Sequence, residues 1–222
     1  MIYLIQIPTV LYIIRVLENK YNNDYLSHKN CKEITDNIIS IYHALYLIIG
    51  SILYLNNIFS MTIYDSILLH SILYTINDLI KLYKYDNKMK YELTIHHMLL
   101  IFVNLSKKLV VLETTHTYYV ALNYLTEMST PTLNLSHNLY FLNKKHTFLF
   151  KMCTIMTCVL YFLFRILLLI YLLIDELNND ELKNHTYQYT LSCSSQSILL
   201  LLNCYWFNKI TKLMIKHNGF FK

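Results

Sequence analysis

The chain has 222 residues, of which 55% are hydrophobic and 15% charged, and its formal net charge is +5. Its apolar residues gather in blocks of about 20, the length that an α-helix needs to cross the hydrocarbon of a bilayer. This pattern excludes a single soluble domain and predicts an all-α polytopic membrane protein with about seven transmembrane helices. Because the Lys residues fall between the apolar blocks and form no basic domain, the charge indicates topology and argues against a nucleic-acid partner.

The N-terminal part predicts two spans separated by a loop. Residues 1–17 lack the basic start and the small-residue cleavage site of a signal peptide, so we interpret them as a membrane helix. Residues 18–33 are rich in Asn and Lys and are expected to form a cytosolic loop. The second span, about residues 37–59, contains His43, and Asp36 is expected to cap its start.

The third predicted span, about residues 62–83, carries three polar side chains on one face. His70, Tyr74 and Asp78 follow one another at intervals of four residues, which places them on the same side of a helix. Asp78 is a candidate catalytic residue. An ion pair with Lys81 on the same helix is the alternative interpretation.

The fourth predicted span, about residues 94–112, opens with two adjacent histidines. His96 and His97 point about 100° apart on a helix, so we expect only one of them to face an interior cavity. Lys107 and Lys108, near the far end, are expected to extend their aliphatic stems along the helix to the headgroups.

The fifth predicted span, about residues 117–139, has a polar stripe with spacings of three or four. Its members are His116, Tyr119, Asn123, Glu127, Thr130 and Asn134. Lipid tails offer such groups no partner, so we expect the stripe to face other helices, either around a ligand or as polar contacts between helices. Pro131 removes one backbone hydrogen bond and is expected to kink the helix just after Glu127.

The C-terminal part predicts two more spans. Residues 148–174 are strongly apolar apart from Arg165, for which an ion pair with Glu127 is one interpretation. An acidic loop follows, and the last span covers about residues 191–207, with Ser192, Gln196 and Asn203 on one face. The tail, residues 216–222, is expected to be cytosolic.

The cysteines do not suggest a metal site. They show no metal-ligand spacing, and we interpret all five as free packing residues: Cys31, Cys153, Cys158, Cys193 and Cys204. The single histidine pair is too few for the His-rich metal site of membrane lipid hydroxylases, so we expect no bound metal.

The distribution of Lys and Arg predicts the orientation of the seven spans. With the N-terminus in the lumen, fifteen of the 19 Lys and Arg residues fall in cytosolic segments, three fall in lumenal segments, and Arg165 lies within a span. Cytosolic loops carry an excess of these residues, so the pattern predicts a lumenal N-terminus and a cytosolic C-terminus.

This topology brings ionisable residues of three helices to the cytosolic level: His43, Asp78, His96 and His97. Glu127 is expected near mid-membrane. An ionisable side chain at membrane depth is costly and marks a site or an ion pair. We therefore expect a polar cavity inside the bundle that opens toward the cytosol and closes near Glu127.

Six segments together resemble the TLC (TRAM-Lag-CLN) domain family of eukaryotic endomembrane proteins. They are SIYHALYLIIGSILYL with His43, YTINDLIKL with Asp78, the pair His96 and His97, LNYLTEMSTPTLNL with Glu127, FLFRILLLIY with Arg165, and LNCYWFNKI. The resemblance covers residues 34–215. It implies six helices around a central lipid-accessible cavity, a location in the endoplasmic reticulum or another endomembrane, and a role in lipid synthesis or membrane composition.

The sequence departs from ceramide synthases within this resemblance. Roughly thirty residues after the histidine pair, those enzymes carry a His-Asp followed by another Asp. Here the corresponding stretch is Thr126-Glu127-Met128-Ser129-Thr130. The segment Glu-x-Ser-Thr-Pro-x-x-Asn is similar instead to the TLC-domain-containing transmembrane branch.

Three hypotheses follow. In the first, the protein binds lipids or fatty-acyl chains and influences membrane lipid composition. Its candidate binding residues are His43, His70, Asn123, Glu127, Thr130, Asn134 and Arg165. In the second it is a sphingoid-base N-acyltransferase with His96 or His97 as general base, Asp78 orienting a histidine, and acyl-CoA as co-substrate; no other cofactor is expected. In the third it is an interaction protein, such as a cargo receptor or a translocon accessory.

Overall fold

The computed structural model describes residues 28–84, 90–106 and 113–218. Every regular element in these ranges is helical, so the predicted all-α class is confirmed for the described part of the chain. The elements are α2 (His28–Leu55), α3 (Met61–Lys84), α4 (Lys90–Ser106), α5 (Glu113–Tyr124), the 3₁₀ segment η2 (Leu125–Ser129), α6 (Thr130–Phe141), α7 (Phe148–Leu160), the π segment η3 (Tyr161–Leu167), α8 (Leu168–Asn178), α9 (Asp180–Lys183) and α10 (Thr186–Asn218).

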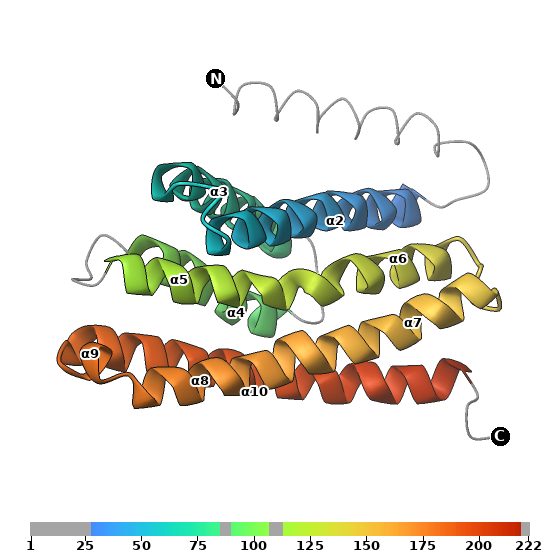
Figure 1. The fold of residues 1–222 in the computed structure, drawn as a ribbon. Helices are drawn as coiled ribbons and strands as arrows, with labels where there is room; N and C mark the ends of the chain where they lie inside the picture. The colour runs from blue at the N-terminus through green and yellow to red at the C-terminus, as the bar shows by residue number, and fades with distance from the viewer. Residues whose placement is uncertain (1–27, 85–89, 107–112, 219–222) are drawn as a thin grey trace.

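The long helices lie side by side in an elongated bundle (Figure 1). Helix α2 packs against α3, α5, η2 and α6, and α6 packs in turn against α7. Helix α10 packs against α4, η3 and α8. The continuous run α5–η2–α6 thus lies between the α2–α3 pair and the layer formed by α7, α8 and α10 (Figure 1).

Asparagines in the left-handed conformation end two of the long helices. Asn57 and Asn143 follow α2 and α6 with φ of 57° and 58°, values that Asn tolerates better than most residues. After α6, the N–H of Lys144 donates to the carbonyl of Leu139 at 2.8 Å, which satisfies one of the orphan carbonyls at the helix end. Thr147 then caps the start of α7. These turns fix the antiparallel course of α6 and α7.

The first described helix differs from its prediction. Helix α2 begins at His28, so residues 28–33 are helical and do not form a loop. Asp36 lies well inside this helix and does not cap it. Its carboxylate instead lies 2.5 Å from the ammonium group of Lys81 on α3. A cross-helix ion pair therefore takes the role that local capping logic assigned to Asp36.

Three other predictions concern the remaining spans. Helix α3 agrees with its predicted range to within one residue at each end. The first span, residues 1–17, lies outside the described residues, and so do Lys107 and Lys108. The predicted last span is part of the longer helix α10, which extends beyond it at both ends.

Two irregular segments meet at the centre of the bundle. The α-helix is interrupted between Leu125 and Ser129, and Pro131 occupies the first turn of α6. The departure from α geometry predicted at this proline is confirmed, since proline cannot donate the i to i−4 hydrogen bond. The 3₁₀ segment η2 packs against the π segment η3, and this contact carries the polar cluster described below.

The described surface combines exposed apolar side chains with buried polar ones. Along α7, η3 and α8, Phe162, Leu163 and Ile174 are exposed, whereas Arg165 and Glu176 are buried. This arrangement is the reverse of that in a water-soluble protein, and it suits the hydrocarbon of a bilayer, which offers polar groups no partner. Lys32–Leu55 and Phe148–Asn178 are each long and apolar enough to cross a membrane. No other helix in the described ranges meets these criteria, and residues 1–17 lie outside those ranges, so the number seven stays a prediction.

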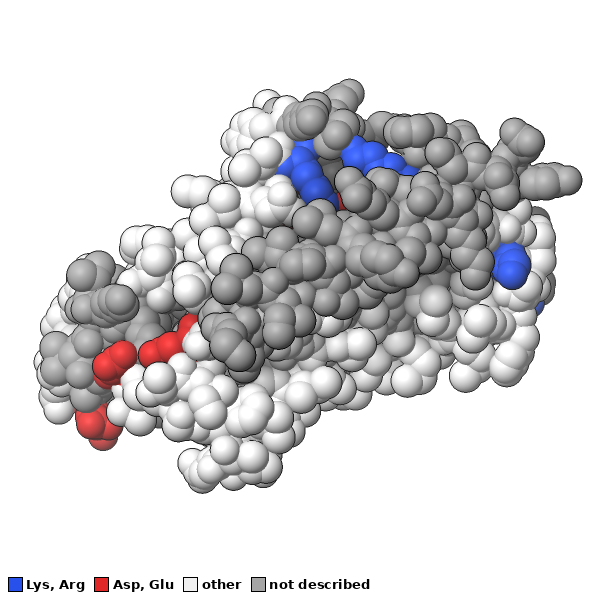
Figure 2. Space-filling model, turned by 90° about the horizontal axis from the view of Figure 1, so that it is seen from above, with Lys and Arg blue, Asp and Glu red and all other residues white. Residues whose placement is uncertain are grey.

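Charged side chains concentrate toward the two ends of the bundle. Figure 2 shows Asp and Glu toward the left end of that view and Lys and Arg at its upper middle and right. At the opposite end from α9, Glu92 of α4 lies 3.3 Å from Lys209 of α10. The pKa of the Glu92 carboxyl is lowered, first by its own backbone N–H and then by Lys209. This exposed pair links two helices at one rim of the bundle.

Candidate functional site

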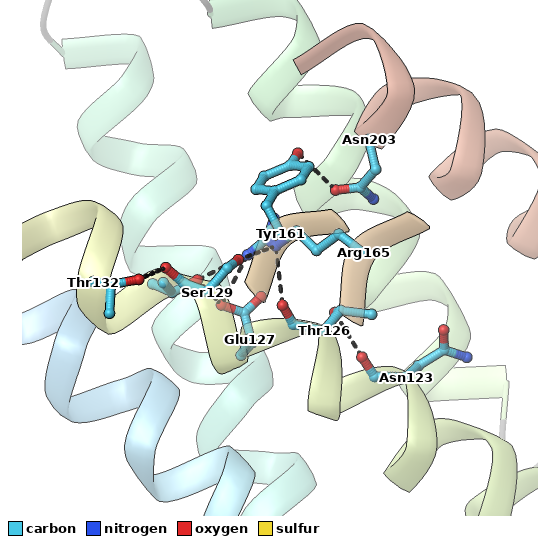
Figure 3. A network of polar contacts seen from close by, with 9 residues as sticks. Asn123, Thr126, Glu127, Ser129, Thr132, Tyr161, Arg165 and Asn203 are labelled. Atoms are coloured by element: carbon cyan, nitrogen blue, oxygen red, sulfur yellow. Dashed lines mark hydrogen bonds and ion pairs between the residues drawn. The ribbon is translucent and has the colours of Figure 1, made fainter. Parts of the chain in front are cut away.

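Arg165 is the centre of a buried polar cluster (Figure 3). From η3 its Nε donates to the carbonyl of Thr126 and to the hydroxyl of Ser129, both at 3.0 Å. Its Nη2 donates to the hydroxyl of Thr130 at 2.8 Å and to the carboxylate of Glu127 at 3.2 Å. The hydroxyl of Thr130 also donates to Glu127 at 2.5 Å. The ion pair interpretation of Glu127 and Arg165 thus agrees with the geometry.

The 3₁₀ turn explains how one guanidinium reaches so many oxygens. Tightening of the backbone at η2 brings a main-chain carbonyl, two hydroxyls and a carboxylate from Thr126 to Thr130 onto one side. A buried charge is tolerated only when it is paired and its remaining protons find acceptors. Arg165 meets both conditions, and the ring of Tyr161 lies 5.2 Å from its Cζ. The cluster therefore holds α5–α6 against α7–α8.

A further set of hydrogen bonds connects the polar cluster around Arg165 to α10. The hydroxyl of Tyr161 donates to the Asn203 side chain at 2.9 Å, and the amide of Asn203 donates to the carbonyl of Leu199. Figure 3 shows Asn203 approaching the cluster from the α10 side, with Asn123 one turn before η2. Three helical runs are thereby joined by polar contacts at one depth.

The structure divides the two adjacent histidines between different surroundings. His97 Nε2 lies 2.7 Å from the carboxylate of Asp78 on α3. His96 instead lies against Trp206 of α10, with ring centroids 5.3 Å apart in an edge-on arrangement. The alternative pairing of Asp78 with Lys81 is wrong, because Lys81 pairs with Asp36. The helical offset of about 100° accounts for this division.

His43 and His70 form an aromatic stack with Tyr74. The rings of His43 and Tyr74 are stacked with centroids 3.7 Å apart, and His70 lies 5.6 Å from His43. His43 is buried. These side chains join α2 to α3, and none of them lines the pocket described next. Asn134 is buried on α6 and does not line it either.

A pocket lies among α4, α5, η2, α8 and α10, and we call it the α4–α10 pocket. Its volume is about 50 Å³, enough for a few water molecules. Side chains such as Leu100, Val120 and Leu199 form its apolar middle. Along α10 its lining runs from Leu191 to Asn203, which is roughly 18 Å at 1.5 Å per residue. The pocket is therefore narrow and long.

The two ends of the α4–α10 pocket are polar. One end is lined by His96, Glu127 and Asn203, and the other by Glu176 and Ser192. Of the predicted cavity residues, the structure brings Asn123 and Glu127 to this lining, together with His96. His97 and Asp78 are not among the described lining residues.

The position of the pocket corrects one expectation. We expected a cavity that opens toward the end of the bundle where α4 begins. The α4–α10 pocket instead extends from Glu127 toward the opposite end, near α9. At the expected end, His97 contacts Asp78, and Trp206 packs against His96.

The far end of the pocket contains residues that sequence reasoning missed. The hydroxyl of Ser192 donates to Glu176 at 2.7 Å, and the hydroxyl of Tyr119 donates to Asp175 at 2.7 Å. Glu176 falls in the acidic loop expected after residue 174, but it lies on α8, which continues to Asn178. Its spacing from Arg165, four, three and four residues through Leu169 and Leu172, places all four on one buried face. That periodicity was the available signal.

The described residues do not form a metal site. No group of three or more His, Cys, Asp and Glu side chains comes together among them. Four cysteines are free in the described ranges: Cys153, Cys158, Cys193 and Cys204.

Comparison with known proteins places the chain in a family. No curated protein matches its sequence. The family profile of the TLC domain matches residues 26–212, which is 187 of the 222 residues. This range agrees with the resemblance found over residues 34–215 and contains every described helix except the last turns of α10. The chain therefore belongs to the TLC domain family, whose members are generally membrane proteins linked to lipid metabolism.

Proposed function

We propose that this protein binds a lipid or fatty-acyl chain in the α4–α10 pocket and thereby influences the lipid composition of the endoplasmic reticulum or another endomembrane. The observation that carries the proposal is a narrow pocket with an apolar middle and two polar ends. Membership of the TLC domain family supports a role in lipid metabolism.

The walls of the pocket suit an alkyl chain. Leu100, Val120, Leu169 and Leu199 contribute methyl and methylene groups, which gain free energy when they contact hydrocarbon in place of trapped water. The pocket is slim, so the proposal concerns a single chain whose entry widens it. The remainder of a larger lipid would stay outside the bundle.

The test is to fill the pocket and measure bound lipid. Leu199 is buried in the lining and Leu201, two residues later on α10, is 71% exposed. Leu199→Trp should reduce the lipid that copurifies with the full chain by about tenfold, since the indole overlaps the site of the chain. Leu201→Trp is the matched control and should retain it. Lipid mass spectrometry of the two detergent-purified variants decides; equal lipid in both sinks the proposal.

The His97–Asp78 contact favours a second candidate function, a sphingoid-base N-acyltransferase that uses acyl-CoA. A carboxylate 2.7 Å from an imidazole nitrogen orients the ring. However, the oriented histidine is absent from the described lining, whereas His96 lines the pocket and contacts Trp206. The geometry therefore favours lipid binding over catalysis.

The enzyme hypothesis has its own assay. Purified protein is incubated with labelled acyl-CoA and a sphingoid base, and the N-acyl product is measured. Catalysis predicts a product that disappears when His96→Ala and His97→Ala are combined. Absence of product, or product unchanged in that variant, excludes this function.

A further inference from the structure

The lining of the α4–α10 pocket contains several buried polar atoms that lack a hydrogen-bond partner among the described residues. Among the described residues, nothing hydrogen-bonds to Asn104 Oδ1, Asn123 Oδ1, Glu176 Oε2 or Gln196 Nε2. All four side chains line the pocket. Glu176 is 1% exposed and Gln196 is 2% exposed. Leaving a buried polar atom unpaired costs free energy, so such a concentration calls for a ligand.

The other contacts of Asn123, Asn104 and Glu176 fix the orientation of these three side chains. Asn123 Nδ2 donates to the carbonyl of Tyr119, and Asn104 Nδ2 donates to the hydroxyl of Tyr124. The oxygens of both amides are therefore left as acceptors. Glu176 Oε1 already accepts from Ser192. These four atoms are thus three acceptors and one amide donor; Nδ1 of His96, which lines the pocket beside Glu127, is also unpaired.

The combination of three unpaired acceptors and one unpaired donor favours some ligand end groups over others. An ammonium donates hydrogen bonds and cannot accept the one that Gln196 Nε2 offers. A carboxylate or a phosphate only accepts, so it would leave the three oxygens unpaired and would meet no Lys or Arg among the described lining residues. A hydroxyl group both donates and accepts, so two neighbouring hydroxyls can donate to two of the three oxygens and also accept from Gln196 Nε2.

We propose that the α9 end of the pocket binds the uncharged polyol end of a single-chain lipid, with its hydroxyl groups between Glu176, Gln196 and the two asparagines. The inference rests on the proposed function, because the alkyl chain of that lipid would occupy the apolar middle. It adds the identity of the end group and assigns Glu176, Gln196 and Asn104 to the binding site.

Four probes with the same dodecyl chain separate the end groups: 1-O-dodecylglycerol, dodecylamine, dodecanoate and dodecane. Binding to the detergent-purified full chain is measured by native mass spectrometry. We expect dodecylglycerol to bind about tenfold more tightly than each of the other three, because it alone can both donate to the unpaired oxygens and accept from Gln196 Nε2. Equal or tighter binding of dodecylamine or dodecanoate overturns the polyol assignment.

Variants of Glu176 and Gln196 provide a second test of the polyol proposal. Combining Glu176→Leu with Gln196→Leu should abolish the preference for dodecylglycerol and leave dodecane binding unchanged. Glu176→Leu removes the acceptor of the Ser192 hydroxyl, so thermal unfolding checks that the double variant is folded. Gln196→Met, which keeps the side-chain shape, should weaken the preference by itself. Glu181→Leu, on the exposed face of α9, is the control and should keep it.

The outcomes distinguish this inference from the proposed function. Suppose that dodecane binds and Leu199→Trp abolishes its binding, but that dodecylglycerol binds no more tightly than dodecane. This result refutes the polyol assignment and supports the proposed site for the alkyl chain. Failure of all four probes to bind refutes the chain site and the polyol end together. A preference that survives the double variant overturns the assignment to Glu176 and Gln196.

Discussion

Arg165 is held by a single short segment of the chain. Its four described acceptors are the Thr126 carbonyl, the Ser129 and Thr130 hydroxyls, and the Glu127 carboxylate. Its side chain is 9% exposed and that of Glu127 17%. Removing one member of a buried pair costs more than removing both, because the remaining charge stays buried and uncompensated.

Arg165→Leu should therefore lower the free energy of unfolding by about 3–5 kcal/mol. Arg165→Leu combined with Glu127→Leu should recover most of that loss, since neither charge is then left alone. Arg165→Lys should fall between them, because an ammonium cannot reproduce the fork of hydrogen bonds. Denaturant unfolding in detergent micelles measures all three variants.

The control for this cycle is an exposed pair. Lys183 and Asp180 form an ion pair on α9 at 2.8 Å, and Lys183→Leu should leave the unfolding midpoint unchanged because such pairs contribute little. A double variant as unstable as Arg165→Leu alone would show that the cluster does more than neutralise charge.

At the level of elements, α2 and α3 approach each other at Gly50. A side chain at this position would collide with Cδ1 of Ile67 and would lie 3.3 Å from its Cγ2. The glycine thus permits the contact that builds the core cluster containing Leu47, Tyr64 and Ile67. Small residues at a crossing let membrane helices pack closely.

Gly50→Leu should destabilise the protein by about 1–3 kcal/mol through overpacking of this crossing. Gly50→Ala should cost much less, because the end of the Ile67 side chain can rotate and alanine favours the helix by about 1 kcal/mol over glycine. Ile49→Leu, at an exposed neighbouring position of α2, is the matched control. Thermal unfolding of Gly50→Leu at the wild-type midpoint would refute the tight crossing.

For the whole molecule, the open question is which end of the bundle faces the cytosol. The α9 end is acidic, and the end containing Lys144 and Lys145 is basic. The excess of Lys and Arg in cytosolic loops predicts that α9 is lumenal. On that orientation the α4–α10 pocket occupies the lumenal half of the bundle.

Cysteine labelling in sealed microsomes tests this orientation. In a chain whose five native cysteines are replaced by serine, Lys144→Cys should react with a membrane-impermeant maleimide and Glu181→Cys should react only after detergent is added. Both positions are exposed, so accessibility within the fold does not limit the reaction. The reverse pattern would invert the topology and would move the pocket to the cytosolic half.

The sequence by itself determined the class, the family and the placement of most helices. Apolar blocks of membrane length predicted an all-α membrane protein, and Pro131 predicted the break at η2, because both depend on properties of contiguous residues. The segments around His43, Asp78, Glu127 and Arg165 predicted the TLC domain family, which the match over residues 26–212 confirms.

Only the tertiary structure decided which polar groups meet. Spacing along one helix offered Asp78 the neighbour Lys81 and offered Asp36 a capping role, whereas packing pairs Asp78 with His97 and Asp36 with Lys81. The location of the pocket likewise depends on side chains from α4, α5, η2, α8 and α10. The physical reason is that a polar group in an apolar interior takes whichever partner the packing of helices brings within hydrogen-bond distance, and sequence separation carries no information on that choice.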